Sequence, residues 1–175
     1  ISNPDIHIWV QDFTYIWWGN SFYYLAVTLN LFNREVVGWS LGRYHNADLI
    51  CDSLLMALAY HEPPQIVHND RGSEYMSQKH SDLCSAFNIQ MSASAPGSPW
   101  QNGFMERFFA TFKNECSDKI KNVNEAGELY EVIANWIYYY NHNRIHTSLK
   151  MSPIAFAQKV FHKEKSSKKE NLNVE

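Results

Sequence analysis

Three β-rich segments fill the first 41 residues, and this crowding constrains the fold more than any other feature of the chain. Residues 6–13 alternate in polarity, residues 21–29 are dense in Tyr, Phe and Val, and residues 35–41 read EVVGWSL. Only a short polar turn at residues 30–34 separates the second segment from the third. Segments of this kind joined by short turns predict an antiparallel meander of three strands.

Helices and short strands alternate after this meander. Asn46 predicts a helix start, because Asn is a favoured N-cap, and Pro63 predicts its end. The later segments predict a strand at 65–69, a helix at 77–87, a strand at 89–91, a helix from the cap Ser98 to about 116, and a helix at 125–141. This order predicts an α/β fold with a mixed sheet flanked by helices on both faces. We expect one domain at 1–158 and a charged, flexible tail at 159–175.

Composition supports a packed fold and weighs against a simple DNA-binding module. Hydrophobic residues make up 45% and aromatic residues 15% of the 175 residues, which is typical of a globular domain. The formal net charge of −3 lacks the basic surplus of a free-standing DNA binder, but it allows an enzyme that meets DNA locally. The three cysteines, Cys51, Cys84 and Cys116, are widely spaced, and we expect reduced, buried thiols in a cytoplasmic protein.

Three acidic residues occupy positions that predict a shared site. Asp12 lies in an apolar strand, where an unpaired carboxylate is costly. Asp70 directly follows the buried strand segment and precedes a turn glycine, Gly72. Glu106 lies in a helix and shares one face with Gly103. Taken singly, an acid of this kind is more often a cap or a surface charge, and only the whole pattern favours a shared site.

Two strand-end aspartates and a helical glutamate form a set of oxygen ligands. Such ligands suit Mg²⁺ or Mn²⁺, which prefer hard donors and retain water molecules that a substrate can displace. Two ions held together could activate a nucleophile and stabilise a leaving oxygen in phosphoryl transfer. We therefore expect two divalent ions at Asp12, Asp70 and Glu106.

Four ordered motifs carry a resemblance to a known family. They are Trp9-x-x-Asp12-x-Thr14-Tyr15, His68-x-Asp70-x-Gly72-x-x-Tyr75, Gly97-x-Pro99-x-x-Asn102-x-x-x-Glu106-x-Phe108-x-x-x-Lys113-x-Glu115, and Tyr140-Asn141-x-x-Arg144-x-His146-x-x-Leu149-x-x-Ser152-Pro153. Thirty-five residues separate Asp70 from Glu106. In order and spacing, the motifs resemble the integrase core of bacterial insertion-sequence transposases, within the retroviral integrase superfamily. The Trp17–Trp18 pair is unusual for this family.

The resemblance implies a ribonuclease-H-like fold with a five-stranded sheet and a metal-dependent DNA transposase. The reaction implied is cleavage at transposon ends, followed by attack of the new 3′ hydroxyl on a DNA phosphodiester. The partners implied are transposon-end DNA, target DNA and at least one further copy of the chain. We also expect a DNA-binding region upstream of Ile1 and action at the bacterial nucleoid. A catalytically silent DNA-assembly module and a nuclease of the same fold are the alternatives.

Further residues are predicted to support this function. By resemblance, Lys113 contacts DNA near the transposon end, and the alternative is a solvated or ion-paired lysine. Asn102, Arg71 and Arg144 are predicted DNA contacts, with helix capping or surface ion pairs as their alternatives. His142 and His146 have the i, i+4 spacing of a zinc pair but lack a third close ligand. We expect the segment that carries them to pin the last helix to the core or to meet DNA.

Overall fold

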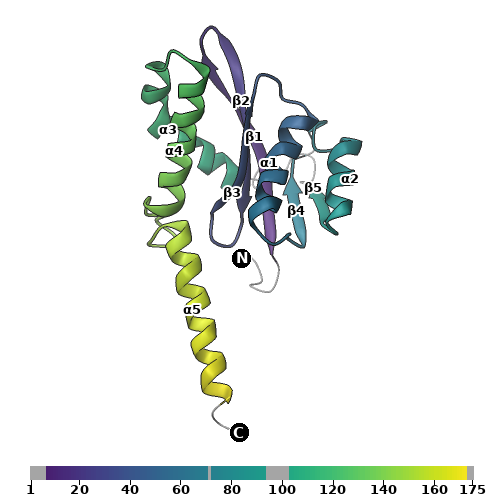
Figure 1. The fold of residues 1–175 in the computed structure, drawn as a ribbon, viewed down its shortest axis with the longest axis vertical. Helices are drawn as coiled ribbons and strands as arrows, with labels where there is room; N and C mark the ends of the chain where they lie inside the picture. The colour runs from purple at the N-terminus through teal and green to yellow at the C-terminus, as the bar shows by residue number, and fades with distance from the viewer. Residues whose placement is uncertain (1–6, 71, 94–102, 173–175) are drawn as a thin grey trace.

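The computed structural model describes residues 7–70, 72–93 and 103–172, with side chains described as far as residue 163 (Figure 1). The strands are β1 (Ile8–Trp18), β2 (Ser21–Asn30), β3 (Val36–Gly42), β4 (Ile66–Asn69) and β5 (Gln90–Ala93). The helices are α1 (Ala47–Tyr60), α2 (Gln78–Ala86), α3 (Gly103–Lys121), α4 (Ala126–His142) and α5 (Pro153–Leu172).

The five strands form one mixed sheet in the order β3-β2-β1-β4-β5. Strands β1, β2 and β3 pair antiparallel, which confirms the predicted meander. Strands β4 and β5 add in parallel to the other edge of β1. The α/β class and the mixed sheet are therefore confirmed, and β1 lies at the centre of the sheet.

Strand β1 is longer than the sequence predicted. It runs to Trp18 instead of ending at Phe13, and Trp18 pairs with Ser21 of β2. Gly19 and Asn20 connect the strands with φ values of 57° and 62°. Two left-handed residues in a two-residue turn match the twist of a tight hairpin, so the strands continue to the turn.

The last helices also differ from the prediction. Helix α3 continues beyond 116 to Lys121, and its predicted start at Ser98 lies outside the described residues. Residues 153–172 form α5, so the predicted flexible tail is helical as far as Leu172. Ser152 accepts a hydrogen bond from the backbone N–H of Ala155 at 3.4 Å, and Pro153 is the first helical residue. Both are helix-start signals. The domain boundary at 158 remains a prediction.

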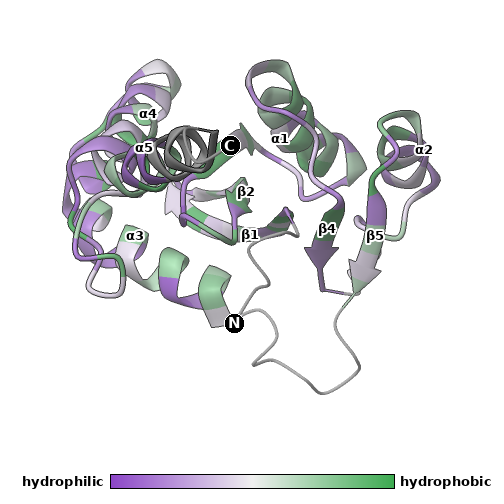
Figure 2. Cartoon of the chain, turned by 90° about the horizontal axis from the view of Figure 1, so that it is seen from below, coloured by the Kyte–Doolittle hydropathy of each residue, from purple (hydrophilic) through white to green (hydrophobic). Residues whose placement is uncertain are grey.

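The helices pack in two layers on the two faces of the sheet. Helices α3 and α4 lie on one face and α1 and α2 on the other, as Figures 1 and 2 show. Alternation along β1 divides its side chains between these layers. Val10 and Ile16 belong to the core under α3 and α4, whereas Trp9 packs with Leu54 and Cys84 from α1 and α2.

A buried polar network joins the sheet to the layer of α1 and α2. The amide nitrogen of Gln11 donates to the Thr28 hydroxyl at 3.1 Å, and Gln11 Oε1 lies 2.8 Å from His80 Nε2. The Ser53 hydroxyl lies 3.2 Å from that of Thr28. Satisfied buried polar groups of this kind fix the relative positions of the elements that carry them. The network lies on the sheet face opposite Asp12, where it fixes β1 against the layer of α1 and α2.

Candidate active site

Asp12 lies near the middle of β1, on the sheet face that α3 covers. It shares that face with Val10 and Ile16, because alternate residues of a strand point to the same side. The side chain is half-buried, and its Oδ1 accepts a hydrogen bond from the backbone N–H of Phe13 at 2.8 Å. The carboxylate is thus held at the sheet surface below the helix that carries Glu106.

Asp70 comes directly after β4, the strand next to β1. The two strands are parallel, and their last printed pair is Val10 with His68. Asp12 and Asp70 each lie two residues beyond that pair. Neighbouring strands are about 4.8 Å apart, so this register brings the two aspartates to adjacent positions.

Gly72 shapes the turn that follows Asp70. Its backbone N–H donates to Asp70 Oδ1 at 2.9 Å. A Cβ at this position would lie 3.0 Å from Asp70 Oδ1 and 2.9 Å from Glu74 Oε2. The missing side chain therefore allows the backbone to approach the carboxylate, which confirms the geometric role predicted for Gly72.

Tyr75 lies within electrostatic reach of both aspartates. Its side chain is fully buried, and its hydroxyl has no hydrogen-bond partner among the described residues. Burial raises its pKa well above the usual value, and the charges of Asp12, Asp70 and Glu74 raise it further. The hydroxyl therefore lies within electrostatic reach of three carboxylates. The sequence supplied Tyr75 only as a motif position, and nothing local indicated its burial beside the acids.

His45 and Glu74 form an ion pair that the sequence did not predict. His45 Nδ1 lies 2.7 Å from Glu74 Oε1, and the His45 ring stacks on Phe13. Burial opposes ionisation of Glu74, but hydrogen bonds from its own backbone and from His45 outweigh it and lower the pKa of Glu74. The two residues lie 29 positions apart in the sequence, so no local spacing could have indicated the pair.

Glu106 is the third acid of the predicted site. It lies exposed in the first turn of α3. Within the described residues, no three His, Cys, Asp or Glu side chains are grouped closely enough to hold a metal ion. The strand register places Asp12 and Asp70 at adjacent positions, and the three acids as a metal site remain a prediction. Asn102 and Arg71 lie outside the described residues.

Gly103 opens the approach to Glu106. A Cβ on Gly103 would meet nothing within 4 Å, so no described part of this protein requires the glycine for close packing. The described residues show no close approach of a strand at Gly103.

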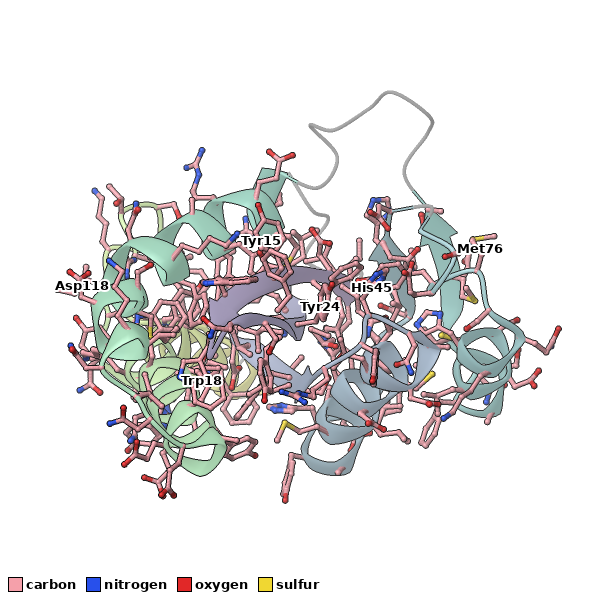
Figure 3. The ribbon with its side chains drawn as sticks, turned by 90° about the horizontal axis from the view of Figure 1, so that it is seen from above. Tyr15, Trp18, Tyr24, His45, Met76 and Asp118 are labelled. Atoms are coloured by element: carbon pink, nitrogen blue, oxygen red, sulfur yellow. The ribbon has the colours of Figure 1, made fainter. Side chains whose placement is uncertain are left out.

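Lys113 lies two helical turns beyond Glu106, beside the β1–β2 hairpin. Its Nζ is 4.2 Å from the centre of the Tyr15 ring, which Figure 3 labels next to α3. Tyr15 is 57% exposed and Trp17 60%, and both help to line a hollow of about 300 Å³. Trp18 instead donates its Nε1–H to the Val123 carbonyl at 2.8 Å. The unusual tryptophan pair therefore divides into one exposed and one structural side chain.

The C-terminal motif packs around α4. Arg144 Nε donates to Glu115 Oε1 at 2.9 Å, and His146 Nε2 lies 2.8 Å from the Tyr140 hydroxyl. The His142 ring stacks on Tyr138 with a centroid distance of 4.0 Å. The two histidines have these separate partners, which is the packing role expected of the motif.

The three cysteines are buried and have no disulfide, as expected. Burial raises the pKa of the Cys84 and Cys116 thiols to about 11. Within residues 7–70, 72–93 and 103–172, no helix is both long and apolar enough to cross a membrane.

Comparison with known proteins agrees with this geometry. Residues 4–99 match the integrase core domain family, and residues 87–153 match a second family of the same description. The transposase for insertion sequence element IS904 of Lactococcus lactis is 33% identical over 81% of this chain and 57% of its own length. Transposase InsF for insertion sequence IS3A of Escherichia coli is 39% identical over 62% of this chain and 38% of its own length. The chain thus spans between about a third and three fifths of these relatives.

The fold is also similar to solved structures. The HTLV-2 integrase catalytic core domain, solved in complex with magnesium in a trimeric form, superposes with a TM-score of 0.71. The match covers 86% of this chain and 95% of that one at 20% identity, which establishes the ribonuclease-H-like fold. With more than half of its residues matched to the family, the chain belongs to the integrase core domain family of insertion-sequence transposases.

Proposed function

We propose that this chain is the catalytic domain of a DNA transposase, which cleaves transposon ends and joins the new 3′ hydroxyl to a DNA phosphodiester. One observation carries the proposal. Asp12 and Asp70 occupy adjacent positions on neighbouring parallel strands, and the charges of both raise the pKa of the buried Tyr75. Adjacent carboxylates can hold divalent ions that catalyse phosphoryl transfer.

The donor set fits a divalent metal site. Asp12, Asp70 and Glu106 offer carboxylate oxygens, the hard ligands that Mg²⁺ and Mn²⁺ prefer. The unpartnered Tyr75 hydroxyl beside two of these acids fits a site that takes up a hydrated cation. Two bound ions would supply Lewis acidity for the attacking and leaving oxygens of the displacement.

The other residues of the site would bind and orient DNA. Glu106 would complete the ligand set from α3, where open space at Gly103 lets a DNA strand approach. Lys113, on the same helix face, would contact a phosphate. Asn102 and Arg71 remain proposed DNA contacts by their motif positions.

Transposition also requires partners beyond this domain. Joining two ends to a target needs at least two active sites, so we propose a homo-oligomer that assembles on transposon-end and target DNA. The trimeric form reported for the HTLV-2 domain supports assembly. The relatives extend well beyond the matched region, which supports an additional DNA-binding part in the intact transposase.

The test combines metal binding with catalysis. Asp70→Asn and Glu106→Gln should each weaken Mg²⁺ binding in calorimetry and abolish Mg²⁺-dependent strand transfer to plasmid DNA. Circular dichroism should show an unchanged fold, because both side chains are at least partly exposed. Glu131→Gln, which removes an exposed charge from α4, serves as the matched control. Full activity in either of the first two variants would refute the assignment.

A second candidate is a catalytically silent DNA-assembly module of the same fold. It is favoured by the absence, among the described residues, of any three side chains grouped to hold a metal. The wild-type protein distinguishes the two candidates. A silent module would bind duplex DNA but neither bind Mg²⁺ at Asp12 and Asp70 nor transfer strands.

A further inference from the structure

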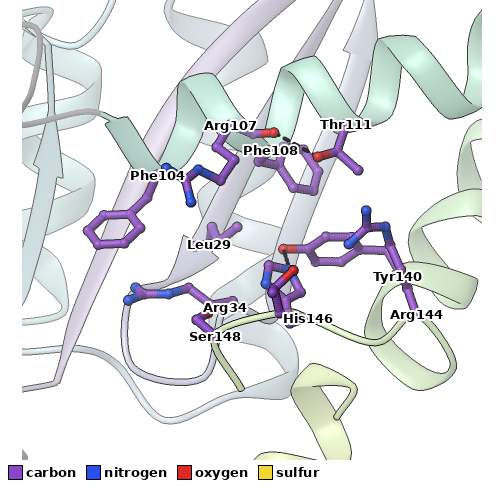
Figure 4. Close-up of a pocket in the computed structure, with 11 residues that line it drawn as sticks. Leu29, Arg34, Phe104, Arg107, Phe108, Thr111, Tyr140, Arg144, His146 and Ser148 are labelled. Carbon is purple, nitrogen blue, oxygen red and sulfur yellow. Dashed lines mark hydrogen bonds between the residues drawn. The ribbon is translucent and has the colours of Figure 1, made fainter. Parts of the chain in front are cut away.

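A polar hollow of about 250 Å³ lies beside α3, on the flank away from Lys113. Figure 4 shows its walls, which come from α3, the β2–β3 turn, the end of α4 and the segment that follows α4. Three arginines from three of these segments line it: Arg34, Arg107 and Arg144. His146 and Ser148 add further polar groups to its lining.

Arg34 is held toward the hollow by its surroundings. Its guanidinium lies 3.8 Å from the centre of the Phe104 ring, and its Nη1 donates to the Leu31 carbonyl. The backbone of Arg34 adopts a φ of 65°, a left-handed conformation that is uncommon for residues other than glycine. Partial burial disfavours the charged guanidinium and lowers the pKa of Arg34, so keeping the charge in this position costs free energy. A cation maintained in this way indicates an anionic ligand.

The hollow has an excess of positive charge. Arg144 pairs with Glu115, whose other oxygen accepts a hydrogen bond from Trp136 Nε1 at 3.1 Å. Among the described residues, neither Arg34 nor Arg107 forms a salt bridge. Among the described residues, the three guanidinium groups therefore have one carboxylate partner, Glu115, which pairs with Arg144.

The pKa of His146 indicates that the charges of the three arginines act on one point of the hollow. Burial lowers the pKa of His146, and the charges of Arg144, Arg34 and Arg107 lower it further. The ring is therefore neutral at pH 7, with Nε2 at 2.8 Å from the Tyr140 hydroxyl. A neutral imidazole between three arginines leaves the site positive without adding a charge of its own.

We propose that this hollow binds a phosphate group of the DNA backbone, an inference that rests on the proposed DNA-processing function. Planar guanidinium groups match phosphate oxygens in pairs, which favours phosphate over a halide or a neutral ligand. The volume is below the roughly 300–1,000 Å³ of pockets for drug-sized molecules, so it suits one phosphate with its sugar.

The position of the hollow favours DNA over free phosphate. Phe104, Arg107 and Thr111 follow one another at helical spacing and form its α3 wall. Glu106 and Lys113 lie on the opposite flank of the same helix, outside the buried stripe. A duplex crossing the exposed side of α3 would thus place phosphates at the hollow and at the proposed catalytic site together.

The experiment uses the 175-residue chain and three variants. Arg107→Gln removes an exposed charge that contributes no salt bridge, so folding should be retained. Arg107→Lys keeps the charge but loses the paired geometry. Lys159→Gln removes an exposed charge from α5 and is the matched control. Circular dichroism and thermal unfolding verify each variant.

Two probes distinguish the sources of phosphate. Fluorescence anisotropy measures binding of a 30-base-pair mixed-sequence duplex at several salt concentrations, without metal or catalysis. Loss of one phosphate contact should reduce the slope of log affinity against log salt by about 0.9. Arg107→Gln should bind about tenfold more weakly, as expected for one hydrogen bond to a charged group. Arg107→Lys should keep the slope and lose part of the affinity, and Lys159→Gln should match wild type.

Inorganic phosphate, titrated in a thermal-shift assay, is the second probe. Wild-type affinity and slope in Arg107→Gln would overturn the proposal. Stabilisation by inorganic phosphate that depends on Arg107, together with unchanged DNA binding, would overturn DNA as the source. Neither binding assay requires metal or strand transfer. Both can therefore be interpreted even if the proposed catalytic function fails.

Discussion

The buried hydroxyl of Tyr75 provides a direct test of how the candidate site is built. Tyr75 and Tyr140 are both almost fully buried, but among the residues that the structure describes only the Tyr140 hydroxyl has a partner, His146 Nε2 at 2.8 Å. Changing each to Phe keeps the ring and removes one oxygen. The pair of variants therefore separates the cost of an unpaired hydroxyl from the benefit of a paired one.

The expected magnitudes have opposite signs. Tyr140→Phe should lower the free energy of unfolding by about 0.5–1.5 kcal/mol, the net contribution of a typical hydrogen bond. Tyr75→Phe should raise it by up to about 1–3 kcal/mol, because the desolvation cost of an unpaired buried hydroxyl is removed. The ring of Tyr75 would keep its contacts with Phe13 and His80, whose ring centroids lie 6.5 Å and 6.0 Å away.

Urea unfolding in a chelating, metal-free buffer measures the difference. Each kcal/mol corresponds to about 2–4 °C in midpoint temperature for a domain of this size, so thermal unfolding provides a second measurement. Destabilisation of Tyr75→Phe by as much as Tyr140→Phe would mean that the Tyr75 hydroxyl has a strong partner. That result would remove the unpaired hydroxyl from the argument for a cation site.

Three further predictions concern stability. Gly38→Ala should destabilise the fold by about 1–3 kcal/mol or more in urea unfolding, because its Cβ would lie 2.1 Å from the Ser53 carbonyl oxygen of α1. Gly127→Ala, where a Cβ meets nothing within 4 Å, should be neutral or stabilising, and equal effects would contradict the packing argument. Asn141→Ala should lower the free energy of unfolding by about 2–4 kcal/mol in the same assay, since Asn141 makes two hydrogen bonds of 2.9 Å to the Val36 backbone. A decrease of less than about 0.5 kcal/mol would argue against these hydrogen bonds. Burial lowers the pKa of His68 and His80 in the native state. The native state therefore binds fewer protons than the unfolded state below about pH 6.5, and the free energy of unfolding should fall as the pH drops from 7.5 to 5.5. A urea midpoint that stays constant over that range would contradict this prediction.

Local sequence signals predicted most of the fold because they reflect short-range physics. Alternation identified the three strands of the meander, and Asn46 caps α1 by accepting a hydrogen bond from Leu49 N–H at 3.1 Å. Helix α5 was missed because its charged residues resemble a solvated tail. The start signals Ser152 and Pro153 were present but were treated only as motif positions.

The candidate site was predictable only in part. Asp12 and Asp70 were singled out as acids in or directly after apolar strands; Asp12 lies inside the longer β1 and not at its end, and the parallel register of β1 and β4 places the two acids side by side. The His45–Glu74 pair and the burial of Tyr75 depend on contacts between distant segments. Sequence periodicity carries no information about such contacts, so the surroundings of the two aspartates required the structure.

The C-terminal motif shows why a matched motif does not by itself assign roles. The sequence predicted that this segment either pins the last helix or meets DNA, and the structure shows the packing role at Asn141, whereas DNA contact by Arg144 remains a proposal. Asn141 is buried and bonds both backbone groups of Val36, so it holds α4 to the edge strand β3. Arg144, three residues later, is only partly buried, and it lines the arginine-rich hollow beside α3. Changes at Asn141 should therefore alter stability first, whereas changes around the hollow should alter DNA affinity in a folded protein.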